Sequence, residues 1–217
     1  MALPRLYIIA DYDYLGGGQP WRDYLAALHD AQDVIIQIRA HRLFEKDPAA
    51  FAAMAATARS LFRQELGTQT ILLLNGPPTL SSQLGYTGTH LPEYRIGESK
   101  PAGGNNFTTC AVHSAAALQQ AEQTAVDAVL FAPVFAPNSK TGMGVGVSEL
   151  QAICAESRLP VYALGGVTAD NAALCLANGA YGVAVLGSVA RAPEPLVAIT
   201  QLQAALHAST DDPVTRG

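Results

Sequence analysis

Short runs of aliphatic and β-branched residues alternate along the chain with longer segments of helical periodicity. Several of the short runs are continuously apolar, which is typical of parallel strands covered on both faces. The pattern predicts strands at Leu6–Ala10, Val34–Ile38, Ile71–Leu74, Thr89–Leu91, Phe107–Val112, Ala128–Val134, Val161–Leu164 and Val183–Leu186. It predicts helices at Trp21–His29, Pro48–Leu66, Thr79–Leu84, Ala115–Gln123, Ser148–Ser157, Ala172–Ala177 and Pro195–His207.

This alternation predicts an α/β fold. Strands that alternate with helices form a parallel sheet with right-handed crossovers. In a chain of 217 residues, eight such units favour a closed (β/α)8 TIM barrel over the alternative, an open doubly wound sheet. We expect one barrel domain over residues 1–208, followed by a frayed tail at 209–217. The functional side chains of a barrel lie just after its strands, at the C-terminal face.

Composition narrows the class of protein further. Hydrophobic residues make up 49% of the chain, enough to exclude intrinsic disorder. The formal net charge is −5, which argues against a nucleic-acid partner. Cys110, Cys154 and Cys175 lack C-x-x-C spacing, so neither a disulfide framework nor a zinc ribbon is expected. With no signal-peptide pattern and no membrane-length apolar run, we expect a cytoplasmic protein without a membrane partner. The oligomeric state, a homo-oligomer included, stays open.

Two successive glycine-containing corners carry the most specific chemical signal. One strand ends in Gly165-Gly166 before a helix, and the last strand ends in Gly187-Ser188. Glycine allows a close approach of the backbone to a ligand. In barrels, the loops after strands 7 and 8 commonly bind phosphate through backbone N–H groups. We therefore expect a phosphate site at these corners.

Several motifs resemble the thiamine phosphate synthase/TenI superfamily. They are Asp127-Ala-Val-Leu-Phe-Ala-Pro-Val-Phe-Ala-Pro-Asn-Ser-Lys140, Leu164-Gly-Gly-Val-Thr168, Gly179-Ala-Tyr-Gly-Val-Ala-Val185 and Val112-His113-Ser114. The resemblance covers residues 33–205, most clearly in the C-terminal half. It implies a (β/α)8 barrel that acts in thiamine biosynthesis. Synthases of this superfamily join hydroxymethylpyrimidine diphosphate to a thiazole phosphate and release pyrophosphate with Mg²⁺.

The resemblance also implies roles for individual residues, with small phosphorylated thiazole and pyrimidine ligands as the partners. Gly165, Gly166, Gly187 and Ser188 match the loops that bind the thiazole phosphate. Gln37 matches a glutamine that binds the pyrimidine, and Lys140 matches a lysine that contacts pyrophosphate. The substrate-binding set expected here is Gln37, Arg39, Asn75, Gly165, Gly166, Gly187 and Ser188.

The chain departs from the synthase pattern at the metal ligands. Synthases carry Asn-Asp-Arg after strand 3, where this chain reads Asn75-Gly76-Pro77. Their second Mg²⁺ aspartate falls at Arg95, and Glu93 is the nearby carboxylate that could replace it. Mg²⁺ on a diphosphate needs one or two carboxylates. We therefore expect no metal ligands and no cofactor, with Mg²⁺ required only if synthase activity is retained.

Other family positions differ as well, and three kinds of function stay open. A family lysine reads His41, a serine reads Ala111, and the histidine of metal-free thiazole tautomerases reads Pro133. His113 and His41 remain as proton carriers near neutral pH, so the expected catalytic set is His113, His41 and Lys140. His90 is expected to be structural. The alternatives are a synthase or tautomerase, a non-catalytic thiazole- or thiamine-phosphate-binding protein, and another phosphosugar-binding barrel.

Overall fold

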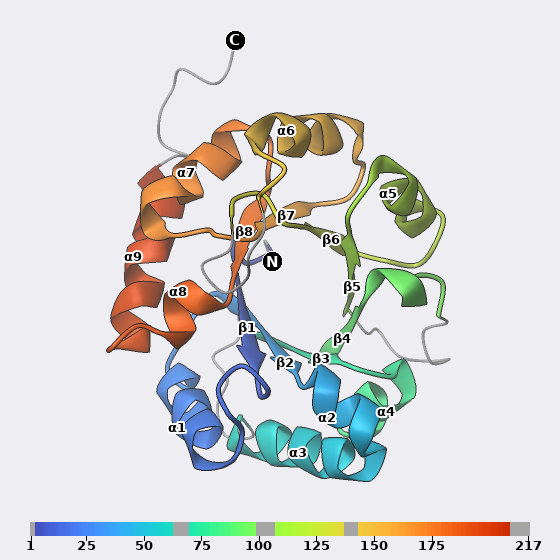
Figure 1. Ribbon diagram of the computed structural model, residues 1–217, viewed down its shortest axis with the longest axis vertical. Helices are drawn as coiled ribbons and strands as arrows, with labels where there is room; N and C mark the ends of the chain where they lie inside the picture. The colour runs from blue at the N-terminus through green and yellow to red at the C-terminus, as the bar shows by residue number, and fades with distance from the viewer. Residues whose placement is uncertain (1–2, 63–69, 99–106, 137–142, 209–217) are drawn as a thin grey trace.

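Parallel strands close into a barrel in a computed structural model that describes residues 3–62, 70–98, 107–136 and 143–208 (Figure 1). Each strand pairs with the next along the chain, and β1 pairs with β8. The predicted (β/α)8 TIM barrel is therefore confirmed. The strands are β1 (Leu6–Asp11), β2 (Val34–Arg39), β3 (Ile71–Asn75), β4 (Gly88–Leu91), β5 (Phe107–Val112), β6 (Ala128–Phe131), β7 (Val161–Leu164) and β8 (Gly182–Val185).

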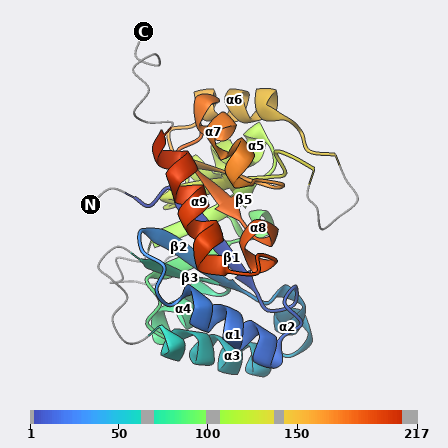
Figure 2. The same ribbon diagram turned by 90° about the vertical axis from the view of Figure 1, so that its left-hand side faces the viewer.

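Helices form a ring around the outside of the barrel, and α9 runs beside α7, α8 and α1 (Figure 2). The helices are α1 (Gly18–Leu28), α2 (His41–Lys46), α3 (Pro48–Leu61), α4 (Pro78–Gln83), α5 (Ala115–Glu122), α6 (Val147–Glu156), α7 (Ala169–Ala177), α8 (Gly187–Ala190) and α9 (Pro195–Ala208). A 3₁₀ turn, η1, spans Glu93–Arg95. Each predicted helix is present, whereas α2, α8 and η1 were not predicted.

Side chains at several helix starts explain where the helices begin. The Asp47 carboxylate accepts a hydrogen bond from the Ala50 N–H (2.9 Å), and Pro48 occupies the first turn of α3. Ser114 accepts from the Ala117 N–H at the start of α5 (3.2 Å). Thr168 and Asn171 form a reciprocal capping box on α7. The short loops after β5 and β7 thus pass directly into capped helices.

The predicted end of the sixth strand is wrong for an identifiable reason. Strand β6 ends at Phe131 rather than Val134, because Pro133 has no N–H to donate to the sheet. Helix α3 ends at Leu61 with Phe62 as its C-cap, and positions 63–66 of the predicted Pro48–Leu66 helix lie outside the described residues. The predicted frayed tail, 209–217, also lies outside them.

Apolar side chains on both faces of the strands make up the core. The outer cluster fills the space between the strands and the helices and includes Trp21, Phe51 and Phe131. The inner cluster fills the barrel itself, through Tyr7, Ile9, Ile35, Leu73, Ala128, Leu130, Tyr162 and Ala184. This two-sided burial explains why most strands read as continuous apolar runs.

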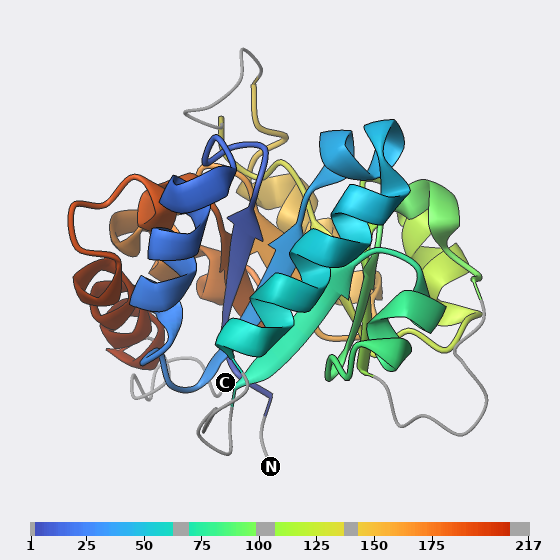
Figure 3. The ribbon, with the colours of Figure 1, turned by 90° about the horizontal axis from the view of Figure 1, so that it is seen from below.

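The C-terminal ends of the strands point to one end of the barrel, where α2 and the loop between β1 and α1 lie (Figure 3). We call this end the barrel mouth, and define it by the residues at or just after the last position of each strand. The side-chain alternation that turns Ile9, Ile35 and Leu73 inward also turns Asp11, Gln37 and Asn75 toward the barrel axis. Among the described residues, no helix is long and apolar enough to cross a membrane.

Gly88 gives a test of the barrel register. It pairs with Leu73 and Phe107, and a Cβ built on it would overlap the Phe107 carbonyl oxygen and lie 2.7 Å from the Phe107 carbonyl carbon. We expect Gly88→Ala to lower the free energy of unfolding by about 3 kcal/mol or more in urea denaturation. Gly187→Ala is the matched control, because its Cβ would meet only the Tyr14 hydroxyl, at 3.3 Å. A Gly88→Ala protein as stable as Gly187→Ala would contradict this register.

Candidate functional site

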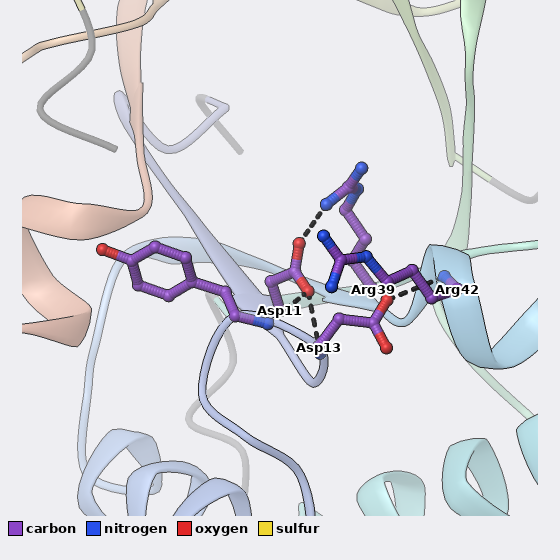
Figure 4. Close-up of polar contacts among 5 residues, drawn as sticks. Asp11, Asp13, Arg39 and Arg42 are labelled. Carbon is purple, nitrogen blue, oxygen red and sulfur yellow. Dashed lines mark hydrogen bonds and ion pairs between the residues drawn. The ribbon is translucent and has the colours of Figure 1, made fainter. Parts of the chain in front are cut away.

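An ion pair joins the ends of β1 and β2 at the barrel mouth (Figure 4). Arg39 donates through Nη1 to Oδ2 of Asp11, while the other oxygen of Asp11 accepts the N–H groups of Asp13 (3.0 Å) and Tyr14 (3.1 Å). The Asp11 side chain is 4% exposed, whereas that of Arg39 is 36% exposed. Asp11 thus holds both the loop after β1 and the guanidinium of Arg39.

Asp11 is a residue that the sequence analysis missed. Asp11 could have been predicted from the sequence, because an aspartate that directly follows a buried parallel strand lies at the face where barrel sites form. The next carboxylate, Asp13, accepts the Arg42 backbone N–H at 2.8 Å and so fixes the first turn of α2 to the same loop (Figure 4).

A buried hydrogen-bond network lies just below the mouth, inside the barrel. Tyr7 donates to Oε1 of Gln37 (2.7 Å), and its hydroxyl lies 3.2 Å from Oγ1 of Thr109. Oγ1 of Thr109 lies 2.9 Å from Nδ1 of His90. We call these four residues the interior network. Burial, and secondly the positive charge of Arg39, lower the pKa of His90 to about 3, so its ring is neutral.

His113 forms a second polar pair, just past β5. Its Nδ1 lies 2.8 Å from Oε2 of Glu93, and its backbone N–H donates to the same oxygen at 2.7 Å. The His113 side chain is 53% exposed. A carboxylate that holds one nitrogen of an imidazole fixes the ring and leaves the other nitrogen, Nε2, for a ligand. This is the arrangement of an oriented general base.

The other predicted histidine lies elsewhere. His41 begins α2, and its Nε2 lies 3.5 Å from Glu45 one helical turn on. Both side chains are exposed. The structure shows no contact between His41 and the other predicted site residues that it describes. Arg95, at the position where the superfamily resemblance implies a metal ligand, pairs with Glu98 through both Nε and Nη2.

The corner after β7 is held by backbone contacts to the loop after β6. The N–H groups of Val134 and Phe135 donate to the carbonyls of Leu164 (2.8 Å) and Gly165 (3.0 Å). Gly165 and Gly166 have φ angles of 104° and 60°, which glycine adopts readily. A Cβ at Gly166 would lie 2.6 Å from the Ala136 carbonyl oxygen, so a side chain there would displace the neighbouring loop.

The corner after β8 opens α8 directly. Gly187 and Ser188 are its first residues, and the first N–H groups of a helix have no acceptor within the helix. The hydroxyl oxygens of Ser188 and Tyr14 are buried and lack a hydrogen-bond partner among the described residues. The guanidinium carbon of Arg191 lies 5.3 Å from the centroid of the Tyr14 ring. Unpaired donors and a nearby cation suit an anion.

Of the two remaining predicted site residues, the structure describes Asn75 and not Lys140. Asn75 ends β3 and pairs in register with His90, so it lies at the mouth beside the interior network. Lys140 lies outside the residues that the structure describes. The cysteines are free, with Cys110 and Cys175 buried.

The residues described at the mouth do not fit Mg²⁺, the ion that the superfamily resemblance implies. Mg²⁺ needs carboxylate or other oxygen ligands with access to the substrate phosphates. Asp11 is engaged by Arg39, Glu93 by His113 and Asp13 by the Arg42 N–H, and Gly76 offers no side chain. Among the described residues, no group of three or more His, Cys, Asp or Glu side chains is placed to hold a metal ion.

Comparison with known proteins gives consistent matches over most of the chain. A family model described as thiamine monophosphate synthase matches residues 6–189. A putative thiamine-phosphate synthase of Geobacter sulfurreducens is 31% identical over 217 residues, covering 95% of this chain and 96% of that protein. A thiamine-phosphate synthase of Methanoculleus marisnigri is 34% identical over 191 residues, covering 85% and 86%.

Solved structures agree at the level of the fold. A thiamine phosphate pyrophosphorylase from Pyrococcus furiosus superposes with a TM-score of 0.74 at 21% identity, covering 95% of this chain and 96% of that one. A 3-hexulose-6-phosphate synthase gives a TM-score of 0.65 at 13% identity, covering 93% and 99%. Both likenesses show the barrel alone.

The neutral state of His90 predicts a specific loss of stability in acid. Unfolded histidine titrates near 6.5, so between about pH 6.5 and 3 the unfolded chain binds a proton that the folded protein does not. As the pH decreases through this window, the free energy of unfolding therefore decreases, by up to about 1.4 kcal/mol per pH unit from this group. In His90→Asn, whose amide can still bond Thr109, we expect this component to be lost. The measurement is urea denaturation of both proteins from pH 7.5 to 4.5. A stability difference between them that stays constant with pH would contradict it.

Proposed function

This chain belongs to the thiamine monophosphate synthase family of thiamine biosynthesis, and we propose that its barrel mouth binds a thiazole phosphate and transfers a proton without a metal. The single observation that carries the proposal is the pairing of His113 with Glu93 at the mouth, where no described set of side chains fits Mg²⁺. A tautomerase-like isomerisation is the reaction class that needs only such a pair.

Phosphate binding is supported by the two corners after β7 and β8. Gly187 and Ser188 contribute N–H groups without acceptors in α8, and the Ser188 hydroxyl lacks a partner among the described residues. A buried hydroxyl without a partner is unfavourable, and an anion would supply the missing acceptor. The Gly165-Gly166 corner is held by the loop after β6, so this side of the site is organised before a ligand arrives.

Proton transfer is supported by the geometry of His113. With Nδ1 held by Glu93, the ring offers Nε2 as the atom that would accept a proton at the mouth. Nε2 would take a proton from one carbon of the thiazole carboxylate phosphate, and the resulting imidazolium, paired with Glu93, would return it to another carbon. No atom is gained or lost in this step, and no metal is needed.

A second candidate is a barrel that binds thiazole or pyrimidine phosphates without catalysis. It is favoured by the arrangement at Arg95, where a synthase would hold a carboxylate and where this chain places a cation already bound to Glu98. Arg39 keeps a partly exposed guanidinium beside Gln37, so a pyrimidine diphosphate could bind there even if transfer does not follow.

Ser188→Ala tests the phosphate site. Because the Ser188 hydroxyl has no partner among the described residues, its loss should change the free energy of unfolding by less than about 0.5 kcal/mol. Thiazole phosphate affinity, measured by calorimetry, should fall about fivefold, the equivalent of one hydrogen bond. Ser81→Ala is the matched control, because the Ser81 hydroxyl donates to the Gly88 carbonyl at 2.5 Å. It should lower stability and leave affinity unchanged. Equal affinity of Ser188→Ala and the parent would place the phosphate elsewhere.

His113→Gln tests the chemistry. In D₂O with a chelator present, we expect the parent protein to exchange deuterium into the thiazole carboxylate phosphate. The exchange is measured as the loss of the ligand signal in proton NMR. His113→Gln should lose at least about 100-fold in rate, as for removal of a general base. His29→Gln changes an exposed histidine that pairs with Asp30 at the end of α1 and serves as the control. No exchange by the parent, with thiazole phosphate still bound, would favour the non-catalytic candidate.

A further inference from the structure

We propose that Tyr7 is a positioning residue, which fixes the amide of Gln37 so that its NH₂ group faces the barrel mouth and selects a ligand with a hydrogen-bond acceptor there. The inference rests on the second candidate of the proposed function, because it assumes that a pyrimidine diphosphate binds beside Gln37. It concerns a residue that lies inside the barrel and whose hydrogen-bond contacts are with Gln37, His90 and Thr109.

The positions of the two residues make this contact strong. Tyr7 and Gln37 lie on adjacent strands, β1 and β2, and are 0% and 1% exposed. The Tyr7 hydroxyl donates to Oε1 of Gln37 at 2.7 Å. Its hydrogen bond is shielded from water, so losing it would cost more than a surface contact would. Burial raises the pKa of Tyr7 above its usual value, which keeps the hydroxyl protonated as a donor.

The rest of the interior network supports the same direction of donation. Tyr7 has one hydroxyl hydrogen, and Oε1 of Gln37 can only accept, so the Tyr7 oxygen must accept in its other two contacts, with Thr109 and with Nδ1 of His90 (3.5 Å). Thr109, at 3.2 Å, can supply a hydrogen. His90, neutral and 2.9 Å from Thr109, can in turn donate to Thr109 from Nδ1. His90, Thr109, Tyr7 and Gln37 then form one continuous series of donors and acceptors.

The consequence for recognition follows from the chemistry of an amide. A free glutamine side chain can present either its oxygen or its nitrogen after a half-turn, and so can accept or donate. With Oε1 held by Tyr7, the NH₂ group lies on the other branch of the amide, and it has no partner among the residues described. A ligand beside Gln37 must therefore offer an acceptor, such as a ring nitrogen. An analogue without that acceptor would leave the NH₂ group unpaired.

Tyr7→Phe tests this, because phenylalanine keeps the ring packing against Tyr162 and His90 and removes only the hydroxyl. We expect the affinity for hydroxymethylpyrimidine diphosphate, measured by calorimetry, to fall about fivefold, while the affinity for thiazole phosphate stays unchanged. Tyr162→Phe is the matched control. Tyr162 is also inside the barrel, but its hydroxyl donates to the Pro4 carbonyl at 2.6 Å, away from the mouth. It should leave both affinities unchanged.

Two further measurements separate positioning from a general loss of stability. In Gln37→Ala, adding Tyr7→Phe should cause no further loss of affinity, since Tyr7 acts through Gln37. In the NMR spectrum of the ligand-free protein, the side-chain amide signals of Gln37, identified by their absence from Gln37→Ala, should shift in Tyr7→Phe and not in Tyr162→Phe.

The outcomes distinguish this inference from the function on which it rests. Unchanged Gln37 amide signals in Tyr7→Phe, or additive losses of affinity in the double variant, would overturn the positioning role. A shift of the amide signals together with a selective loss of pyrimidine affinity would support it. If the parent protein binds neither ligand, the proposed function fails. The amide signals would still show whether Tyr7 orients Gln37.

Discussion

Closure of the parallel barrel is the constraint on which the rest of this structure depends. Closing the sheet places one face of every strand in a confined interior, which must be filled completely by side chains. Apolar residues fill most of it, and the polar residues that enter it must bring their own partners, because water is excluded. Tyr7, Gln37, Thr109 and His90 meet this requirement together. The interior network is thus part of the core and also lies directly below the barrel mouth.

At the mouth itself, three carboxylates are paired with basic side chains of the protein. Asp11 holds Arg39, Glu93 holds His113, and Glu98 holds Arg95. Carboxylates engaged in this way are poor candidates for a divalent cation, which would have to displace a cation or an imidazole already bound. The same pairing leaves one imidazole nitrogen of His113 for a ligand. The same ion pairs thus make these carboxylates poor Mg²⁺ ligands and fix the orientation of the His113 ring.

Strand positions could be predicted from the sequence because burial on both faces makes each strand a continuous apolar run. The short helices α2 and α8 could not. Helix α2 is fixed by Asp13, which accepts the Arg42 N–H, and this contact joins residues from two different units. The glycine-containing corners could be predicted from the sequence because each follows a strand within a few residues. The partnership of Tyr7 with Gln37 was not, because register between strands, rather than local sequence, brings the two together.

The most direct test of the account is to mix the protein with thiazole phosphate and hydroxymethylpyrimidine diphosphate and to follow pyrophosphate release by phosphorus NMR, in Mg²⁺ and in chelator. Because the described mouth residues do not fit Mg²⁺, we expect very slow or no pyrophosphate release in either condition, with thiazole phosphate still bound saturably. Rapid release in Mg²⁺ that stops on chelation would show that this mouth does hold the metal, and would contradict the account.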